Sequence, residues 1–300
     1  MSPVWFARAR AGLGVRCVEG SVAAVASSAG CREPEPWLKL KERGLLPKGG
    51  IFASYRKLFQ ERQWRRNLIV GAVISSTGVV GLWAIGEYAV DLQRAVFKSH
   101  YEAQVPIAAV EQQPGQTEAE VNAARAAAVK ARDAQVAPKV DHAITIAYLL
   151  NMLGAGTGMW LFTRFAAATG RRLAFLVGFT AALAVTFLAY WKMNSPADAY
   201  WMMPLMGAAQ LGVFAGFAIY LPELFPSSVR STGTSFCYNL GRFAAAGGSF
   251  FSAVLTQDVF GHHPAPFPLR YSAMAMCAIF LAGILILPFA PETKGKPLPD

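Results

Sequence analysis

The sequence predicts an all-α polytopic membrane protein with six transmembrane helices. Three observations support this fold class: a low charged fraction, six long apolar segments, and an uneven distribution of basic residues between them. Of the 300 residues, 54% are hydrophobic and 15% are charged, whereas soluble domains average about 25% charged residues. A chain of this composition belongs to the membrane class.

Each of the six apolar segments is long enough to cross a bilayer as a helix. A hydrocarbon core about 30 Å thick requires about 20 apolar residues, and in the absence of water only helices or closed barrels satisfy the backbone. Paired small residues, such as Gly154 with Gly158, permit close packing between helices. Together the spans make residues 67–300 the transmembrane domain. The predicted spans are Asn67–Val90, His142–Thr163, Leu173–Trp191, Tyr200–Leu221, Gly233–Thr256 and Tyr271–Pro288.

Basic residues are concentrated in alternate connections, which predicts the orientation. The short segments on the opposite side contain only Lys192 and Arg270. By the positive-inside rule, both termini are expected in the cytoplasm and the protein in the cell membrane. The net charge of +10 therefore reflects topology, and no nucleic-acid partner is expected. The predicted cytoplasmic set is Arg56, Lys57, Arg62, Arg65, Arg66, Arg164, Arg171, Arg172, Arg230, Lys294 and Lys296.

Three regions are predicted outside the spans. Residues 1–50 are expected to form a basic, largely disordered cytoplasmic region. Residues 51–66 mix apolar and basic side chains and are expected to lie along the cytoplasmic membrane surface as an amphipathic segment. Residues 91–141 are expected to be an extracytoplasmic insertion, in which Thr117 and Glu120 form a capping box before an Ala-rich helix. Whether this insertion is a solvated spacer or binds a partner is left open.

Motifs at two predicted cytoplasmic helix ends resemble those of the major facilitator superfamily, in its C-terminal six-helix half. Residues 220–226 read Tyr-Leu-Pro-Glu-Leu-Phe-Pro and are followed by Arg230 and Gly233. This is similar to the Glu-x-Phe-Pro-x-x-x-Arg-x-x-Gly element between the tenth and eleventh helices of the superfamily. Residues 291–295 read Pro-Glu-Thr-Lys-Gly, the signature that closes the twelfth helix in sugar-porter-like members.

Two further matches to the superfamily are partial. Residues 170–172 read Gly-Arg-Arg and match the end of a loop motif, but Ala167 and Ala168 replace its Asp and Arg. Residues 34–38 read Pro-Glu-Pro-Trp-Leu and loosely resemble the element that follows the sixth helix. The resemblance therefore covers about residues 33–300 and favours sugar-porter-like or organic-acid-symporter-like members.

The resemblance implies a transporter that moves a small organic solute by alternating access, with or without a coupling proton. Such proteins pack two six-helix halves around a central cavity, so this chain represents one half of the bundle. It is expected to be a fragment lacking its N-terminal half, or else to pair with a second six-helix chain. The alternative is a non-transporting membrane subunit or a receptor-like relic of the fold. No nucleophile elbow, phosphate loop or pair of catalytic acids occurs in the sequence, so neither enzyme activity nor a cofactor or metal is expected.

Polar residues near the middle of the spans are the predicted substrate-binding set. Arg242 lies nine residues beyond Gly233, which is about 14 Å into its helix. An arginine at this depth costs at least about 2.5–3.5 kcal/mol, so it either binds an anionic substrate through its planar guanidinium or bonds to neighbouring helix carbonyls. The predicted substrate-binding residues are Arg242, Asn239, Asn151, Gln210, Ser76, Thr77 and, by stacking, Trp83.

A carboxylate partner for Arg242 is not expected within the chain. Glu87 is the nearest candidate, but the helical rise places it about 16 Å above Arg242. A coupling carboxylate is therefore expected in the missing half.

Charged residues at the predicted cytoplasmic helix ends form a second predicted group. The resemblance implies that they make an ionic latch which breaks when the transporter opens inward, while the simpler interpretation is positive-inside charge. The predicted gate residues are Glu223, Arg230, Arg171, Arg172 and Glu292.

Overall fold

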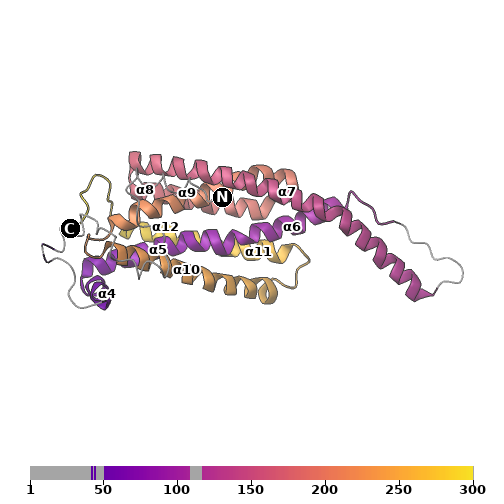
Figure 1. Ribbon diagram of the computed structural model, residues 1–300, viewed down its shortest axis with the longest axis horizontal. Helices are drawn as coiled ribbons and strands as arrows, with labels where there is room; N and C mark the ends of the chain where they lie inside the picture. The colour runs from indigo at the N-terminus through magenta and orange to yellow at the C-terminus, as the bar shows by residue number, and fades with distance from the viewer. Residues whose placement is uncertain (1–41, 43, 45–50, 109–116, 300) are drawn as a thin grey trace, which may run out of the picture. The chain divides into compact units, whose positions relative to one another are not determined.

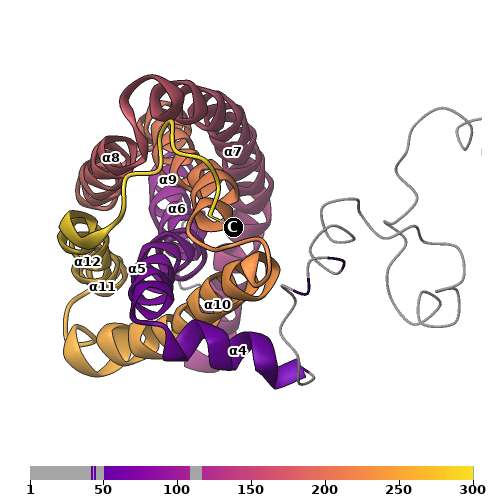
Figure 2. The same cartoon turned by 90° about the vertical axis from the view of Figure 1, so that its left-hand side faces the viewer.

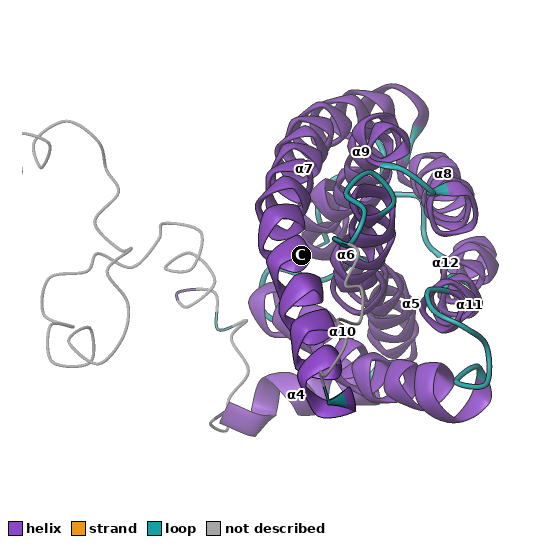
Figure 3. Ribbon diagram, turned by 90° about the vertical axis from the view of Figure 1, so that its right-hand side faces the viewer, coloured by secondary structure: helices purple, strands orange, loops and turns teal. Residues whose placement is uncertain are grey.

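The computed structural model describes residues 42, 44, 51–108 and 117–299, and these form helices and short connections without a strand (Figure 3). The all-α fold class is therefore confirmed. The chain divides into two units, Met1–Lys48 and Gly49–Asp300, and the fold described here is that of the second. Apart from Glu42 and Gly44, the predicted region 1–50 lies outside the described residues, as does the partial match at residues 34–38.

Apart from Ile51–Gln60 (α4), which lies across one end of the bundle, the helices of this unit run roughly lengthwise beside one another (Figure 1, Figure 2). Viewed along the bundle, α5 lies between α10 and α12 (Figure 2), and α9 packs against both α7 and α8. The helices are α4 (Ile51–Gln60), α5 (Arg62–Val79), the π-helix η2 (Val80–Ile85), α6 (Glu87–Glu102), α7 (Glu118–Thr169), α8 (Arg171–Lys192), α9 (Pro196–Glu223), α10 (Arg230–Val254), the π-helix η3 (Leu255–Val259), α11 (Phe267–Met276), α12 (Ile279–Ile286) and the 3₁₀ helix η4 (Leu287–Phe289).

Five helices of the described chain are long and apolar enough to cross a membrane, which confirms a polytopic helical bundle. The fifth predicted span is not among them, although it forms the 25-residue helix α10. A helix of that length spans about 37 Å, so its composition, not its length, sets it apart. Serines, threonines, Asn239 and Arg242 lower its hydropathy, and it packs along α5. The five spans are Arg62–Glu102, Glu118–Thr169, Arg171–Lys192, Pro196–Glu223 and Phe267–Phe289.

The first connection is shorter and more helical than the sequence suggests. The first span continues through η2 and α6 to Glu102, and α7 is a single helix of 52 residues that begins at Glu118. The capping box is confirmed, because Thr117 N donates to Glu120 Oε2 at 2.9 Å and Glu120 N donates to Thr117 Oγ1 at 3.4 Å. Beyond the other helices, α6 and α7 pair as a hairpin (Figure 1), in which Arg132 Nη2 contacts Glu102 Oε1 at 2.8 Å.

Helices α7 and α9 pack with their backbones in contact. A Cβ atom at Gly154 would lie 2.0 Å from Pro204 O, and one at Gly158 would lie 2.2 Å from Ala208 O. No larger residue fits at either position without moving the neighbouring backbone. The predicted role of this glycine pair in close helix packing is confirmed, and the contact fixes the pair of helices that carries Asn151 and Gln210.

Residues 51–66, predicted as an amphipathic segment, form α4 and the start of α5. Helix α4 is attached to the bundle by one face, on which Leu58 is fully buried and Phe59 lies edge-on to Phe236 at 5.8 Å. Phe52 and Arg56 of the same helix are exposed. The placement of this segment on a membrane surface stays a prediction.

Candidate substrate-binding hollows and helix-end network

Two hollows lie on either side of the helix formed by α5, η2 and α6, and share two lining residues. Trp83 and Glu87 line both of them. The larger, which we call the amide hollow, has a volume of about 330 Å³; the smaller, which we call the arginine hollow, has a volume of about 200 Å³. Besides Trp83 and Glu87, the amide hollow is lined by residues of α7 and α9 that include Asn151 and Gln210. The arginine hollow is completed by Val79 and by Arg242, Ala245, Ala246 and Ser249 of α10.

A π-helix presents Trp83 to both hollows. Helix η2 spans Val80–Ile85, and π-turns inside α-helices occur frequently at functional sites. The widened turn is braced from α8, because the buried Tyr190 hydroxyl donates a hydrogen bond to Ile85 O. Trp83 itself is 54% exposed, so most of its indole is free to contact a ligand.

The two predicted amide residues lie at the floor of the amide hollow and also hold helices together. Asn151 Nδ2 donates to Met203 O at 2.9 Å, which links α7 to α9. Gln210 Nε2 donates to Thr186 Oγ1 at 3.0 Å, which links α9 to α8. Both side chains are buried. The structure thus brings Asn151 and Gln210 together with Trp83, as predicted, and gives each amide a structural contact in addition.

Arg242 projects from the exposed face of α10 into the arginine hollow. None of the described residues accepts a hydrogen bond from its guanidinium or forms an ion pair with it. Its helix neighbour Asn239 is also exposed, but its amide donates to Ser235 O of the same helix at 2.9 Å and it does not line either hollow.

Ser76 and Thr77 are the predicted substrate residues that the structure places away from the hollows. Thr77 is 1% exposed, and its methyl group faces α12, where a Cβ at Gly283 would lie 2.7 Å from it. The neighbouring Ser75 is fully buried and donates to Cys237 O at 2.7 Å, which joins α5 to α10. The rotation of this serine–threonine run about the helix axis directs Thr77 into the packed interior.

Glu87 is the site residue that the sequence did not identify. Axial rise predicted a wide separation from Arg242, yet both residues line the arginine hollow. The available signal was helical spacing: Val79, Trp83 and Glu87 recur every four residues and therefore lie on one face of the helix.

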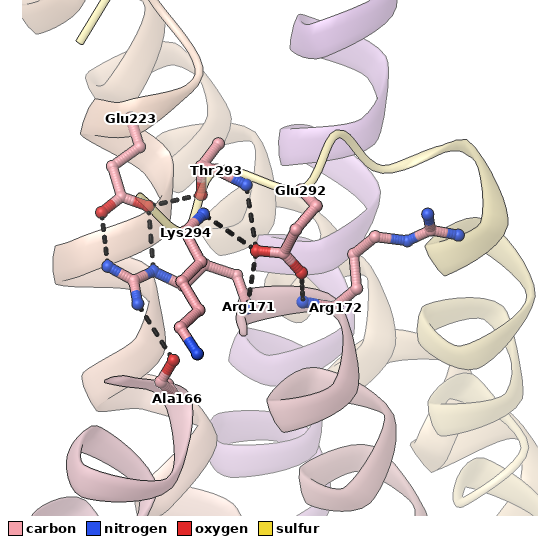
Figure 4. Close-up of polar contacts among 7 residues, drawn as sticks. All are labelled: Ala166, Arg171, Arg172, Glu223, Glu292, Thr293 and Lys294. Atoms are coloured by element: carbon pink, nitrogen blue, oxygen red, sulfur yellow. Dashed lines mark hydrogen bonds and ion pairs between the residues drawn. The ribbon is translucent and has the colours of Figure 1, made fainter. Parts of the chain in front are cut away.

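A second polar cluster, the helix-end network, joins the start of α8 to the end of α9 and to the segment after η4 (Figure 4). Arg171 Nε and Nη2 donate to the two carboxylate oxygens of Glu223 at 3.1 and 2.8 Å. The remaining Nη1 donates to Ala166 O at 3.0 Å. Such a two-point guanidinium–carboxylate contact is among the strongest hydrogen-bonded pairs in proteins. Both side chains are largely buried, with 17% and 18% exposure.

Glu292 closes the network by accepting hydrogen bonds from backbone amides. Those of Arg171 and Arg172, in the first turn of α8, donate at 2.9 and 3.0 Å, and those of Thr293 and Lys294 donate at 3.0 Å each. Burial acts to raise the pKa of Glu292, but these four amides outweigh it and lower the pKa below that of an ordinary glutamate. Gly170 has a φ of 114°, and a Cβ there would lie 2.8 Å from Glu292 Oε2, so this approach requires glycine.

The other two predicted gate residues bind carbonyl groups, not carboxylates. Arg172 Nε donates to Leu287 O at 3.2 Å, and Arg230 Nε donates to Pro222 O and Phe225 O at 3.1 and 3.2 Å. The sequence missed one member of the network: the Thr293 hydroxyl donates to Glu223 Oε2 at 2.5 Å. Thr293 belongs to the motif at residues 291–295, so the motif match could have identified it as a member of the network.

A polytopic helical bundle with polar hollows between its helices and an ionic network at its helix ends has the architecture of a membrane transporter. The family model for sugar (and other) transporters matches residues 134–300. This match covers more than half of the chain, so the chain belongs to that family, within the major facilitator superfamily.

Curated relatives match shorter stretches. The probable 4-methylmuconolactone transporter of Cupriavidus pinatubonensis is 33% identical over 95 residues, which cover 30% of this chain and 20% of the relative. The carboxylic acid transporter protein homolog of Saccharomyces cerevisiae is 29% identical over 121 residues, which cover 38% of this chain and 18% of the relative. The chain therefore spans about a fifth of the length of these relatives.

Proposed function

We propose that this chain forms one half of a secondary transporter that moves a small organic anion by alternating access. The observation that carries the proposal is Arg242, a cation in the middle of a bundle helix that faces a hollow instead of a protein acceptor among the described residues. Membership of the transporter family supports transport as the activity. Relatives named for 4-methylmuconolactone and carboxylic acid transport support an organic solute.

The chemistry of the hollows favours an anion with an apolar body. A guanidinium that is not used by the protein is costly within a membrane unless a ligand or a water-filled cavity receives it, and its planar shape suits a carboxylate. The adjoining amide hollow offers Trp83, Tyr148 and several methionines to an apolar group, with Asn151 and Gln210 beside them. A ligand that joins the two hollows would place its carboxylate on Arg242 and its body against Trp83.

The helix-end network is proposed to act as the cytoplasmic latch. Its position at the predicted basic side supports this role, as does the fact that three separate chain segments meet at Arg171, Glu223 and Glu292. The Arg171–Glu223 pair keeps 17% and 18% exposure, so its contribution lies between that of an exposed pair, about 0–1 kcal/mol, and that of a fully buried one. A network of this size biases the equilibrium between two conformations without locking one of them. With the latch on the cytoplasmic side, both termini are cytoplasmic.

Exposed apolar surfaces on α7 and α10 support packing against lipid or a second six-helix half. On α10, Phe243 and Phe250 are 76% and 81% exposed. On α7, Leu153 is 68% exposed. Because Phe243 neighbours Arg242 on the exposed side of α10, a partner half that covers this face would also close the arginine hollow.

The test is equilibrium binding of benzoate to the purified chain in detergent. We expect wild-type protein to bind benzoate and Arg242→Met to lose at least about tenfold in affinity, equivalent to about 1.4 kcal/mol. The matched control is Arg125→Met, since Arg125 is another exposed arginine, on the part of α7 that lies away from both hollows. The proposal is rejected if wild type binds no benzoate, or if Arg242→Met binds it as tightly as wild type does.

A further inference from the structure

We propose that Arg66 and Arg172 form a binding site for the phosphate group of an anionic phospholipid, at the end of the bundle that carries the helix-end network. Neither residue lines the amide hollow or the arginine hollow. The lipid site therefore goes beyond the proposed function and does not depend on it.

Both arginines bind the same short segment, the 3₁₀ helix η4. Arg66 Nη2 donates to Phe289 O at 2.9 Å, while Arg172 Nε and Nη2 donate to Leu287 O and Pro288 O at 3.2 and 3.3 Å. Helix η4 follows α12, which packs between α5 and α8 (Figure 2). Two guanidiniums from helices far apart in the sequence are thus held at a single turn of backbone.

The positive charge of these arginines is not neutralised by a described carboxylate. Both side chains are exposed, and neither takes part in an ion pair among the described residues. Glu292 is engaged by backbone amides, and the Arg172 guanidinium extends away from it (Figure 4). A guanidinium has more N–H donors than these carbonyl bonds use, and its planar fork suits a phosphate.

The start of α5 adds further positive charge. Arg62 and Arg65 are exposed, and Arg62 lies one turn before Arg66 on the same face of the helix. In residues 51–66 the only acidic side chain is Glu61. Basic clusters directly next to a membrane span attract anionic lipids, so the surroundings of the site have the charge that a lipid phosphate requires.

Exposed apolar side chains next to the arginines favour a lipid over a soluble anion. About one helical turn deeper in the bundle lie Ile69 on α5, Leu176 on α8 and Leu285 on α12, all of them exposed. Each shares a helix face with one of the two arginines or with the exposed Phe289, because residues three or four apart are neighbours on a helix. Cationic groups at the helix ends, above apolar surface along the spans, match a phospholipid with its headgroup outside and its acyl chains inside.

Native mass spectrometry of the purified chain tests the site, with dioleoylphosphatidylglycerol as the anionic lipid and dioleoylphosphatidylcholine as the zwitterionic one. We expect wild type to bind the anionic lipid at least about fivefold more tightly, because each basic residue near an anionic headgroup strengthens binding. We expect the double variant Arg66→Gln/Arg172→Gln to reduce this preference to less than about twofold. Glycerol 1-phosphate, a headgroup without acyl chains, is expected not to displace the anionic lipid.

The matched control is Arg94→Gln/Arg125→Gln, which removes the same charge from exposed arginines of α6 and α7 and is expected to keep the wild-type preference. Equal affinities of wild type for the two lipids would overturn the inference, as would an unchanged preference in Arg66→Gln/Arg172→Gln or the same loss in the control. Displacement by glycerol 1-phosphate would identify a site for soluble anions and reject the lipid. Arg66→Gln alone, which gives up a single described hydrogen bond, provides the same test if the double variant does not fold.

Discussion

Charged side chains at the helix ends and in the hollows are held in opposite ways. In the helix-end network, Arg171 makes a two-point contact with Glu223, and Glu292 accepts hydrogen bonds from four backbone amides. In the hollows, Arg242 and Glu87 have no such partner among the described residues. Bonded charges specify and stabilise a fold, whereas unpaired charges at mid-bundle cost stability and are retained for a ligand. We therefore expect mutations in the helix-end network to change stability and mutations in the hollows to change ligand binding.

Arg171→Met is expected to have the largest effect on stability. It leaves Glu223 largely buried without its guanidinium, and loss of one partner of a buried pair costs about 3–5 kcal/mol. Because both side chains keep some exposure, 17% and 18%, we expect about 2–3 kcal/mol here. Thermal unfolding in detergent measures it. Arg171→Lys keeps the positive charge but loses the two-point contact with the carboxylate, so its unfolding midpoint should lie between those of wild type and Arg171→Met. Equal midpoints for wild type and Arg171→Met would contradict the account.

Tyr190→Phe is expected to lower both the stability of the protein and its affinity for benzoate. It leaves Ile85 O in η2 without its side-chain donor, at a cost of about 1–2 kcal/mol, and it loosens the turn that presents Trp83. We expect a lower unfolding midpoint together with a several-fold loss of benzoate affinity. A variant that loses stability but binds benzoate as wild type does would show that η2 does not need this brace to form the hollow.

Glu292→Gln is expected to cost about 1 kcal/mol at neutral pH, because the amide accepts fewer charge-assisted hydrogen bonds. The lowered pKa of Glu292 also predicts a pH dependence. A carboxylate whose folded-state pKa is depressed contributes stability above its unfolded value, about 4.3, and loses that contribution as pH falls through the lower, folded-state value. Unfolding midpoints measured from neutral to acidic pH should therefore fall less steeply for the variant than for wild type.

Arg242→Met is expected to have the smallest effect on stability, within about 0.5 kcal/mol of wild type, because no described protein acceptor is lost. The same variant loses benzoate binding. A drop in stability as large as that of Arg171→Met would show that Arg242 supports the fold. The contrast between the helix-end network and the hollows would then disappear.

Several features could be predicted from sequence because they depend on local pattern. The lengths of the apolar segments predicted the helical bundle, and the capping box of Thr117 and Glu120 predicted the start of α7. The helix-end motifs identified Arg171, Glu223 and Glu292, which the structure brings together. The composition of α10 departs from the apolar average of a membrane span, so its polar residues, Arg242 above all, were the sequence signal for the proposed site.

Other features depend on information that a linear pattern does not contain. Hydropathy does not separate a solvated helix from a loop, so the extension of α6 to Glu102 was missed. Depth along a helix does not show which way Thr77 faces, because its rotation is set by packing against α12. Axial rise did not reveal that Glu87 and Arg242, although separated along the bundle, line one hollow. The missing quantity in each case is the orientation of a helix face.

We propose that the two hollows together hold an organic anion on Arg242. Photolabelling of the purified chain with 4-azidobenzoate, followed by mass spectrometry, tests it most directly. The account predicts labelling within the segments that line the two hollows, residues 79–93, 144–152, 203–211 and 242–249, suppressed by excess benzoate but not by its neutral analogue benzamide, and absent in Arg242→Met. Labelling elsewhere in the chain, or suppression by benzamide as complete as by benzoate, would contradict it.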